Sequence, residues 1–251
     1  MSKRPPIVAP LAAPVALDQA LEALSIKDAT EEDPMYEETA SEIQQACAAI
    51  PLGSSDGDGR LASALKEIPF LEELKRRLLE AHPTWVIQIS PPRAACDIMI
   101  QGLRINLKLT TGGTDNAMNK PSVFYSLTGR TDYPYSSTAN DFLLEVQKAK
   151  AAGQIKTVRN RSTEYHYLVK NKTTGAVLFK PIFDIHRYIS NPSNDLQINW
   201  KSEFEHVAEV TAEADYLKKV RSLVEAYQTS VRKRVESEMK FAYADLGSLL
   251  E

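Results

Sequence analysis

Apolar positions repeat at helical spacing in four parts of the chain. The pattern occupies residues 17–50, where the acidic stretch EEDPMYEE interrupts it, and then residues 60–82, 139–151 and 212–245. The second of these helices carries a leucine-rich stripe and should end at His82, because the residue before Pro83 avoids the helical region. Each amphipathic helix needs an apolar surface to pack against.

Strand-like runs supply that surface. Alternation and apolar runs predict strands at 85–89, 96–109, 164–170, 176–183 and in the run LQINW after residue 195. Turn-rich loops are expected at 51–60, 132–139 and 191–195, whereas 120–128 is ambiguous. This order predicts an α/β (α+β) fold with a mixed central sheet flanked by helices. We expect one domain over residues 17–251, preceded by a flexible Pro/Ala-rich arm at 1–16.

The stretch CDIMIQGLRINLKLT, residues 96–110, predicts a β-hairpin. A two-residue turn at Gln101-Gly102 sets a register in which Asp97 opposes Asn106. Because side chains alternate along each strand, Asp97, Asn106 and Lys108 share one face. Directly opposed Cβ atoms are roughly 5 Å apart, so these three groups should converge on one patch. The opposite face should pack on the core through Ile98, Ile100, Leu103, Ile105, Leu107 and Leu109.

One carboxylate, one amide and one ammonium on a small patch suit metal-assisted hydrolysis of a phosphodiester. The carboxylate of Asp97 is a hard ligand of the kind that Mg²⁺ prefers, and the amide oxygen of Asn106 adds a neutral ligand. The metal can activate a water molecule, while Lys108 can stabilise developing negative charge or hold the attacking water. The alternative interpretation is a salt bridge between Asp97 and Lys108 within the hairpin.

The order Asp, about ten residues, then x-x-Lys at the end of the next strand resembles the PD-(D/E)xK nucleases. Three more segments, 50–67, 120–126 and 191–199, extend the resemblance to type II restriction endonucleases of the EcoRV and HincII branch. The resemblance implies a restriction-endonuclease-like fold, Mg²⁺ as cofactor and a homodimer that cuts double-stranded DNA at a short palindromic site. It also implies a cognate DNA methyltransferase in the same system, which is not a physical partner.

Two positions depart from the family pattern. Cys96 stands where the family has proline, and Asn106 stands where it usually has the second acid. The missing negative charge should weaken metal binding, so a further acidic ligand is expected. The resemblance puts Glu67 on the helix before the hairpin, where the family often supplies a carboxylate. Glu72 and Glu73 are the fallback candidates, and a plain solvated helix residue is the alternative for Glu67.

The formal net charge of −3 argues mildly against a nucleic-acid partner, but the charges are unevenly distributed. Residues 1–72 hold 5 basic and 13 acidic side chains, whereas the remaining residues hold 25 and 20. The segment 147–172 has seven basic residues against Glu164 alone, typical either of a solvated surface or of a phosphate-binding footprint. We expect Lys156, Arg159 and Arg161 there to contact DNA phosphates, which position a duplex without reading it.

Base-specific contacts are expected in the polar loop and strand after residue 190. Asn and Gln can each bind adenine through two hydrogen bonds, although an ordinary turn is the alternative for 191–195. The further DNA contacts that we expect, including two from the 120–126 resemblance, are Lys120, Ser122, Asn191, Ser193, Asn194 and Gln197.

Other classes of protein find little support. Cys47 and Cys96 lack metal-site spacing and suit a reducing cytoplasm, bacterial or archaeal, and the four histidines form no metal or nucleophile motif. No apolar run is long enough to span a bilayer, so no membrane partner is expected.

The last helix could pack on the core, dimerise, or both. Two functional alternatives stay open: another nuclease of the same fold for repair or junction resolution, and a non-catalytic DNA-binding protein on that fold.

Overall fold

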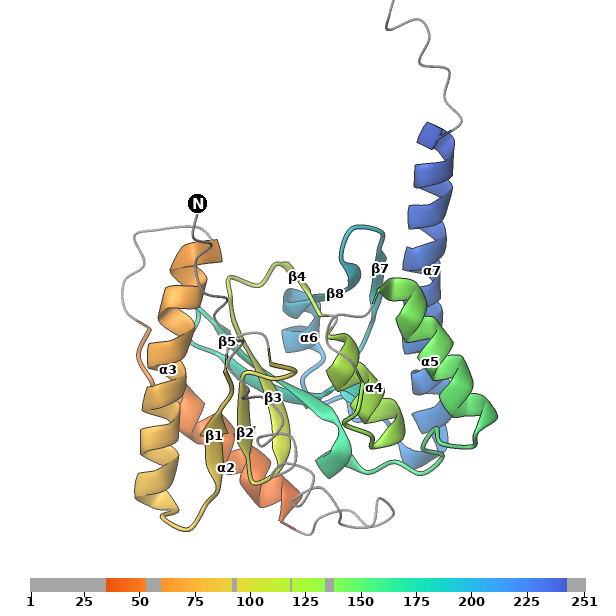
Figure 1. Cartoon of the computed structure of the whole chain (residues 1–251). Helices are drawn as coiled ribbons and strands as arrows, with labels where there is room; N and C mark the ends of the chain where they lie inside the picture. Colours follow the sequence, from red (N-terminus) through yellow and green to blue (C-terminus); the bar gives the residue numbers. More distant parts are fainter. Residues whose placement is uncertain (1–34, 53–59, 92–93, 118, 134–137, 243–251) are drawn as a thin grey trace, which may run out of the picture.

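A five-stranded sheet lies at the centre of the chain (Figure 1). The computed structural model describes residues 35–52, 60–91, 94–117, 119–133 and 138–242, and their side chains except those of 60–66 and 241–242. The strand order is β1-β2-β3-β5-β6, with β3 and β5 parallel and the other neighbours antiparallel. The strands are β1 (Ile87–Ile89), β2 (Ile98–Ile100), β3 (Leu103–Thr110), β5 (Tyr165–Asn171) and β6 (Val177–Pro181). The mixed α/β fold predicted from the sequence is confirmed.

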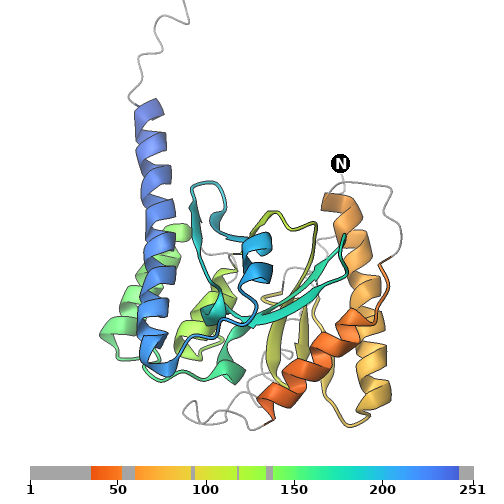
Figure 2. The same cartoon turned by 180° about the vertical axis from the view of Figure 1, so that it is seen from behind.

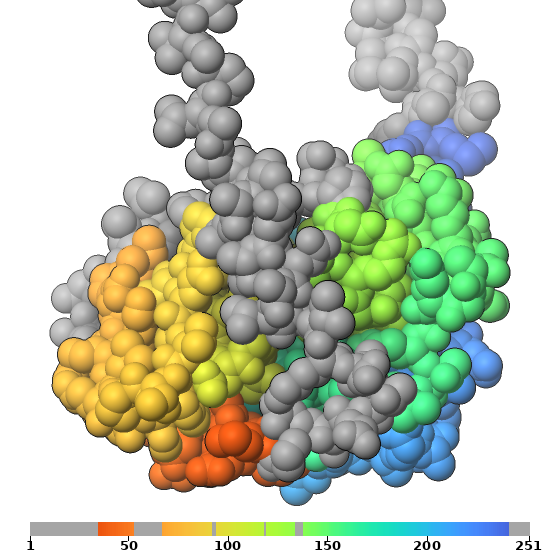
Figure 3. Space-filling view, turned by 60° about the horizontal axis from the view of Figure 1, so that its bottom comes forward, coloured from red at the N-terminus to blue at the C-terminus, as the bar shows by residue number. Residues whose placement is uncertain are grey.

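Helices cover both faces of this sheet. On one face lie α2 (Tyr36–Ala48) and α3 (Arg60–Ala81), which run obliquely past each other in the view from behind (Figure 2). On the other lie α4 (Lys120–Thr128), α5 (Ala139–Ala151) and α7 (Tyr216–Ala242), whose far end extends beyond the rest of the fold. The space-filling view separates the orange and yellow surface of α3 and β1 from the green surface of α4 and α5 (Figure 3).

The alternation of β5 explains why the sheet has two cores. Tyr165, Tyr167 and Val169 pack into the core with α4, α5 and α7, whereas Leu168 packs into the core with α2 and α3. His166 also points to the second face, where its ring stacks on Phe179 at a centroid distance of 5.1 Å. A strand that is buried on both faces reads as a continuous apolar and aromatic run, as this one does.

A second sheet projects from the end of β3. It contains β4 (Thr114–Asn116), β8 (Asp195–Asn199) and β7 (Ile189–Asn191) in that order, all antiparallel. Gly112, at φ 97°, and Gly113 make the turn from β3 into β4, and α6 (Trp200–Glu205) follows β8. Only β8 was predicted, because β4 and β7 are three-residue polar strands that the alternation of apolar residues does not reveal.

The predicted hairpin register is the register found. Ile98 pairs with Ile105 and Ile100 with Leu103, around Gln101 and Gly102 at φ 49° and 84°. Two successive positive φ angles are those of a type I′ turn, which matches the twist of the strands. The apolar face of the hairpin packs toward α2 and α3, as predicted.

Local sequence signals also account for α4 and α5, the helices on the second face of the sheet. Thr138 accepts from the backbone N–H of Asp141 and Asp141 accepts in return, a capping box that starts α5 where the sequence predicts it. The ambiguous segment 120–128 is helix α4, capped by Asn119 and ended by Gly129 at φ 76°. No helix in the described ranges combines the length and apolarity that crossing a bilayer requires. The predictions for the arm at 1–16, for 17–34, for 53–59 and for 243–245 lie outside the described residues.

Candidate active site

Asp97 and Asn106 are in direct contact at the open end of the hairpin. The amide Nδ2 of Asn106 donates to Oδ2 of Asp97 at 2.8 Å, and the backbone N–H of Leu107 donates to the same oxygen at 2.7 Å. The backbone N–H of Asp97 donates to the carbonyl of Ile105 at 2.9 Å, which continues the ladder by one residue beyond β2. The carboxylate therefore has a fixed orientation on the face opposite the apolar residues of the hairpin.

The side-chain oxygen atoms of Asp97 and Asn106 have free lone pairs that could bind a cation. Oδ1 of Asn106 is buried and has no hydrogen-bond partner among the residues that the structure describes. Burial raises the pKa of Asp97, although the Leu107 N–H and the charge of Lys108 oppose that shift. A buried acceptor without a donor, beside a carboxylate that lacks full solvation, is an unfavourable arrangement that a hard cation would relieve. The donor set thus fits Mg²⁺.

Glu67 of α3 contributes a second carboxyl group to the same region. Burial and the negative charge of Asp97 raise its pKa, while the positive charges of Lys108 and Lys172 lower it. Of the two fallback acids, Glu73 is bound to Arg76 and Arg77 at 2.7 and 2.6 Å, and Glu72 is exposed. The half-buried Glu67 is therefore the acid of α3 whose charge is coupled to the hairpin.

Two lysines supply positive charge near these carboxyl groups. Lys108 lies two residues after Asn106 on the same face of β3, and among the described residues its ammonium has no hydrogen-bond or ion-pair partner. Lys172 follows β5, and its backbone N–H donates to the carbonyl of Thr110 at 2.7 Å, which ties it to the end of β3. Lys172 is exposed, so its side chain is available to an anion that approaches the site.

The surroundings fix the strand that carries Asp97. Ser122 of α4 is buried, and its hydroxyl donates to the carbonyl of Ala95, two residues before Asp97. The guanidinium of Arg104 lies 4.3 Å from the ring centre of Tyr125 on the same helix. Helix α4 therefore holds both strands of the hairpin from the side on which the polar groups lie.

Two of the expected phosphate contacts are structural instead. Arg159 is only 8% exposed, and its guanidinium binds Glu164 and Asp184 at 2.8 and 2.9 Å. The ammonium of Lys156 donates to the carbonyl and hydroxyl oxygens of Thr163, at 3.0 and 2.9 Å. Both side chains already donate to partners within the fold, so the structure gives no support to their predicted contacts with DNA phosphates.

Three further predicted DNA contacts also have partners within the fold, and their contact with DNA stays a prediction. Arg161 is ion-paired with Glu37, and its guanidinium lies over the ring of Tyr36 at 4.7 Å. Lys120 binds the carboxylate of Asp195 at 3.3 Å, which pins the start of α4 to β8. Ser122 of α4 is buried, and its hydroxyl already donates to the carbonyl of Ala95. Charge density along the sequence did not distinguish these paired cations from free ones.

The four other predicted contacts lie together on the second sheet. Asn191 donates to Gln197 at 3.0 Å, and its own Oδ1 accepts from the backbone N–H groups of Ser193 and Asn194 at 2.9 and 3.0 Å. Asn116 of β4 joins them, since it donates to Asn194 at 3.1 Å and accepts from Gln197 at 3.3 Å. We call Asn116, Asn191, Asn194 and Gln197 the amide cluster.

Sequence reasoning missed Asn116 and Lys172 as candidate site residues. Asn116 becomes relevant only when β4 pairs with β8, across 81 residues of chain. Lys172 belonged to the basic segment, but its position directly after a strand parallel to β3 was the signal that could have singled it out. Parallel neighbours bring the ends of their strands to the same edge of a sheet.

Comparison of the chain with protein families, with characterised proteins and with solved structures finds no match. Function is therefore inferred from the residues of the site and their contacts.

Proposed function

We propose that this protein is a Mg²⁺-dependent endonuclease for double-stranded DNA, acting at Asp97, Asn106, Lys108 and Glu67. The observation that carries the proposal is the buried Oδ1 of Asn106, which has no hydrogen-bond partner in the described part of the chain and belongs to the amide that donates to Asp97. Two carboxyl groups with raised pKa values and a lysine without a partner among the described residues support it. Acids with perturbed pKa values that cluster beside a cationic side chain are typical of catalytic sites.

Each residue has a distinct role in the proposed reaction. Asp97, the Asn106 amide oxygen and Glu67 would hold Mg²⁺, which when bound activates a water molecule and polarises the phosphate. Lys108 stabilises the negative charge that develops on the phosphate oxygens. The Leu107 N–H keeps one Asp97 oxygen oriented, which would leave the other oxygen for the cation. The backbone of β3 thereby fixes the geometry in advance.

Lys172 and the amide cluster are the parts that would contact the duplex. Lys172 is exposed at the end of β3, and phosphate contacts of this kind hold DNA without reading bases. The amide cluster lies on the sheet that follows β3. Its carboxamides bind one another in this structure, and they would exchange those hydrogen bonds for the two that an adenine offers. A homodimer would let two such sites cut the two strands of a palindrome, and a cognate methyltransferase would protect host DNA.

Plasmid cleavage tests the proposal directly. Metal-free protein is incubated with supercoiled plasmid and then given Mg²⁺, alongside the variants Asp97→Asn and Lys108→Met. We expect Mg²⁺-dependent cleavage by the wild type and a loss of at least about 100-fold in both variants. Asp97→Asn loses the negative charge of the ligand, and Lys108→Met loses the positive charge that would face the phosphate. Lys148→Met is the matched control, since Lys148 is an exposed lysine of α5 paired with Glu145.

The products separate the candidate functions. Discrete fragments support a sequence-specific restriction enzyme, whereas nicks or a smear support a nuclease of the same fold with a repair or junction-resolving role. Binding of duplex DNA without cleavage would leave a DNA-binding protein on a nuclease-like scaffold, with Asn106 as the reason for its inactivity. Full cleavage by Asp97→Asn at low Mg²⁺ would refute the assignment of the site.

A further inference from the structure

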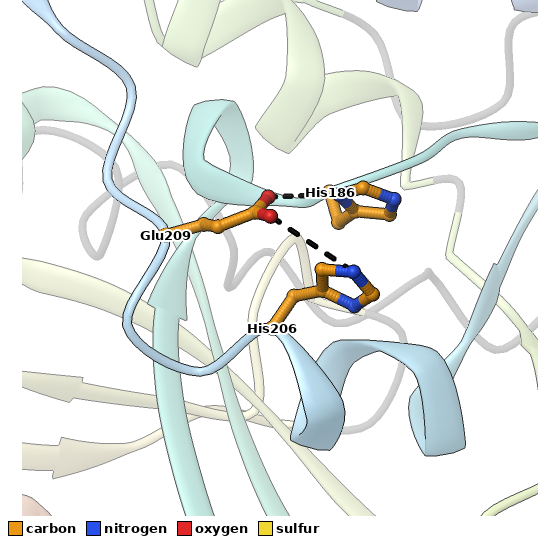
Figure 4. A group of neighbouring side chains, drawn as sticks. All are labelled: His186, His206 and Glu209. Carbon is orange, nitrogen blue, oxygen red and sulfur yellow. Dashed lines mark hydrogen bonds and ion pairs between the residues drawn. The ribbon is translucent and has the colours of Figure 1, made fainter.

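Two histidines and a glutamate meet on the loops behind β6 and α6, away from the hairpin site (Figure 4). His186 lies between β6 and β7, and His206 and Glu209 lie between α6 and α7. Nδ1 of His186 lies 2.8 Å from Oε2 of Glu209, and Nε2 of His206 lies 3.9 Å from its Oε1. One ligand atom from each residue lies within 4.8 Å of the other two.

We propose that His186, His206 and Glu209 form a binding site for a divalent transition metal of the zinc class. Zinc accepts imidazole nitrogen and carboxylate oxygen at about 2.0–2.2 Å, so tetrahedral ligand atoms are about 3.3 Å apart. The observed separations lie on either side of that value. Small rotations of the two rings and the carboxylate would close them around one ion, and solvent would fill the fourth position.

Hydrogen bonds of the neighbouring backbone prepare the two imidazoles. Nδ1 of His206 lies 2.7 Å from the carbonyl of Ser202, which accepts only from a protonated nitrogen. The lone pair of His206 is therefore on Nε2, the atom that faces Glu209. Such an outer hydrogen bond is what fixes the tautomer of metal-binding histidines in general.

The backbone of His186 is held just as firmly. Its N–H donates to the buried carboxylate of Glu203 at 3.0 Å, and its carbonyl accepts from Lys219 at 3.1 Å. Glu203 also binds Lys180 at 3.2 Å, so that lysine is compensated within the fold. Glu209, which lies against both imidazoles, would supply the anionic ligand.

A second His–Glu pair in the same protein shows what an ion pair alone looks like. His82 lies 3.2 Å from Glu42, and no second imidazole accompanies it. At the proposed site the two imidazole rings stack at a centroid distance of 3.8 Å and an angle of 14°. Two imidazoles therefore stand beside the one carboxylate of Glu209, whereas Glu42 has the single imidazole of His82.

Calorimetric titration with Zn²⁺ tests the site. Untagged full-length protein is freed of metal and titrated in excess Mg²⁺, which occupies the carboxylate site at Asp97. We expect saturable binding of one Zn²⁺ that is weakened at least about 10-fold in His206→Gln and in Glu209→Gln, because each loses a ligand. His82→Gln, the matched control, should bind as the wild type does.

Thermal melts of the same proteins complete the test. Side-chain exposures of 33 to 52% at these three residues predict that the variants keep the wild-type melting temperature without zinc. Zn²⁺ should raise the melting temperature of the wild type and of His82→Gln, and not of His206→Gln. The absence of saturable Zn²⁺ binding by the wild type, or equal binding by His206→Gln, would overturn the proposal and leave an ion pair beside a stacked ring.

Discussion

Substitution of Asn106 by Asp introduces the acid that is usual in the nucleases that the hairpin sequence resembles, and the contacts of Asn106 indicate its cost in stability. Nδ2 of Asn106 now donates to Oδ2 of Asp97 at 2.8 Å. In Asn106→Asp that hydrogen bond to a charged acceptor is lost, and a second carboxylate faces the first. The variant should therefore fold less stably without metal and respond more strongly to Mg²⁺.

The magnitude follows from two terms. A hydrogen bond to a charged group contributes about 1.5–3 kcal/mol to stability. Two like charges about 4 Å apart cost about 4 kcal/mol at an effective dielectric constant of about 20. Side-chain rotation and proton uptake relieve part of the sum, so we expect the free energy of unfolding to fall by about 3 kcal/mol. Mg²⁺ at about 100 times its dissociation constant would raise the free energy of unfolding of the variant by about 2.7 kcal/mol.

Urea unfolding at pH 8 measures both effects, once in EDTA and once in Mg²⁺. The wild type should gain little from Mg²⁺, whereas Asn106→Asp should recover most of its loss. Asn106→Ala is the matched control, because it loses the hydrogen bond without adding charge and so should show the same deficit in both buffers. Cleavage of plasmid by Asn106→Asp should reach its half-maximal rate at lower Mg²⁺ than cleavage by the wild type.

The decisive observation is whether Mg²⁺ restores the stability of Asn106→Asp more than that of Asn106→Ala. Equal instability in EDTA and in Mg²⁺ would mean that the Asp97 and Asn106 side chains do not share a cation. If Asn106→Asp were as stable as the wild type in EDTA, the new carboxylate would have to turn away from Asp97. The hydrogen bond between Asn106 and Asp97 would then contribute little to stability.

Three other predictions concern the acid on α3, a buried ion pair and a buried histidine. Glu67→Gln should raise the Mg²⁺ concentration for half-maximal cleavage by about 10-fold or more, while Glu72→Gln leaves it unchanged; equal effects would return Glu67 to the solvated face of its helix. Arg159→Met should lower the free energy of unfolding by about 3–5 kcal/mol, measured with urea, because Glu164 stays buried without its partner. Burial lowers the pKa of His166 to about 3, so the folded state resists its protonation and stability is lost as pH falls below the ordinary value of 6.5. Unfolding of the wild type should cost about 2 kcal/mol less at pH 5 than at pH 7 because of this group, and His166→Phe should flatten that dependence; an unchanged slope would contradict it.

Local patterns were enough for the hairpin and for several helices. Gln101-Gly102 can serve as a two-residue turn between two alternating strands, and that turn aligned Asp97 with Asn106. A capping box at Thr138 marked the start of α5 in the same way. These elements were predictable because each depends on residues close together in the sequence, whose spacing determines which side chains share a face.

Tertiary structure decided which polar groups were free. The basic residues of 147–172 look alike in sequence, yet Arg159 lies in a buried ion pair and Lys172 is exposed beside β3. Burial of a cation depends on partners such as Asp184, and composition cannot assign those partners. A charged side chain enters a core only when partners from other segments compensate its desolvation, so pairing and burial are decided together.

Local spacing of residues was sufficient to predict the hairpin, the pattern of its two faces and the mixed class of the fold. Only the folded chain brought Glu67 into the field of Asp97, joined Asn116 to Gln197, and set His186 against His206. The physical reason is range: alternation and turn geometry act over a few residues, whereas these contacts join segments that are 20 to 81 residues apart and meet only when the sheets and helices pack.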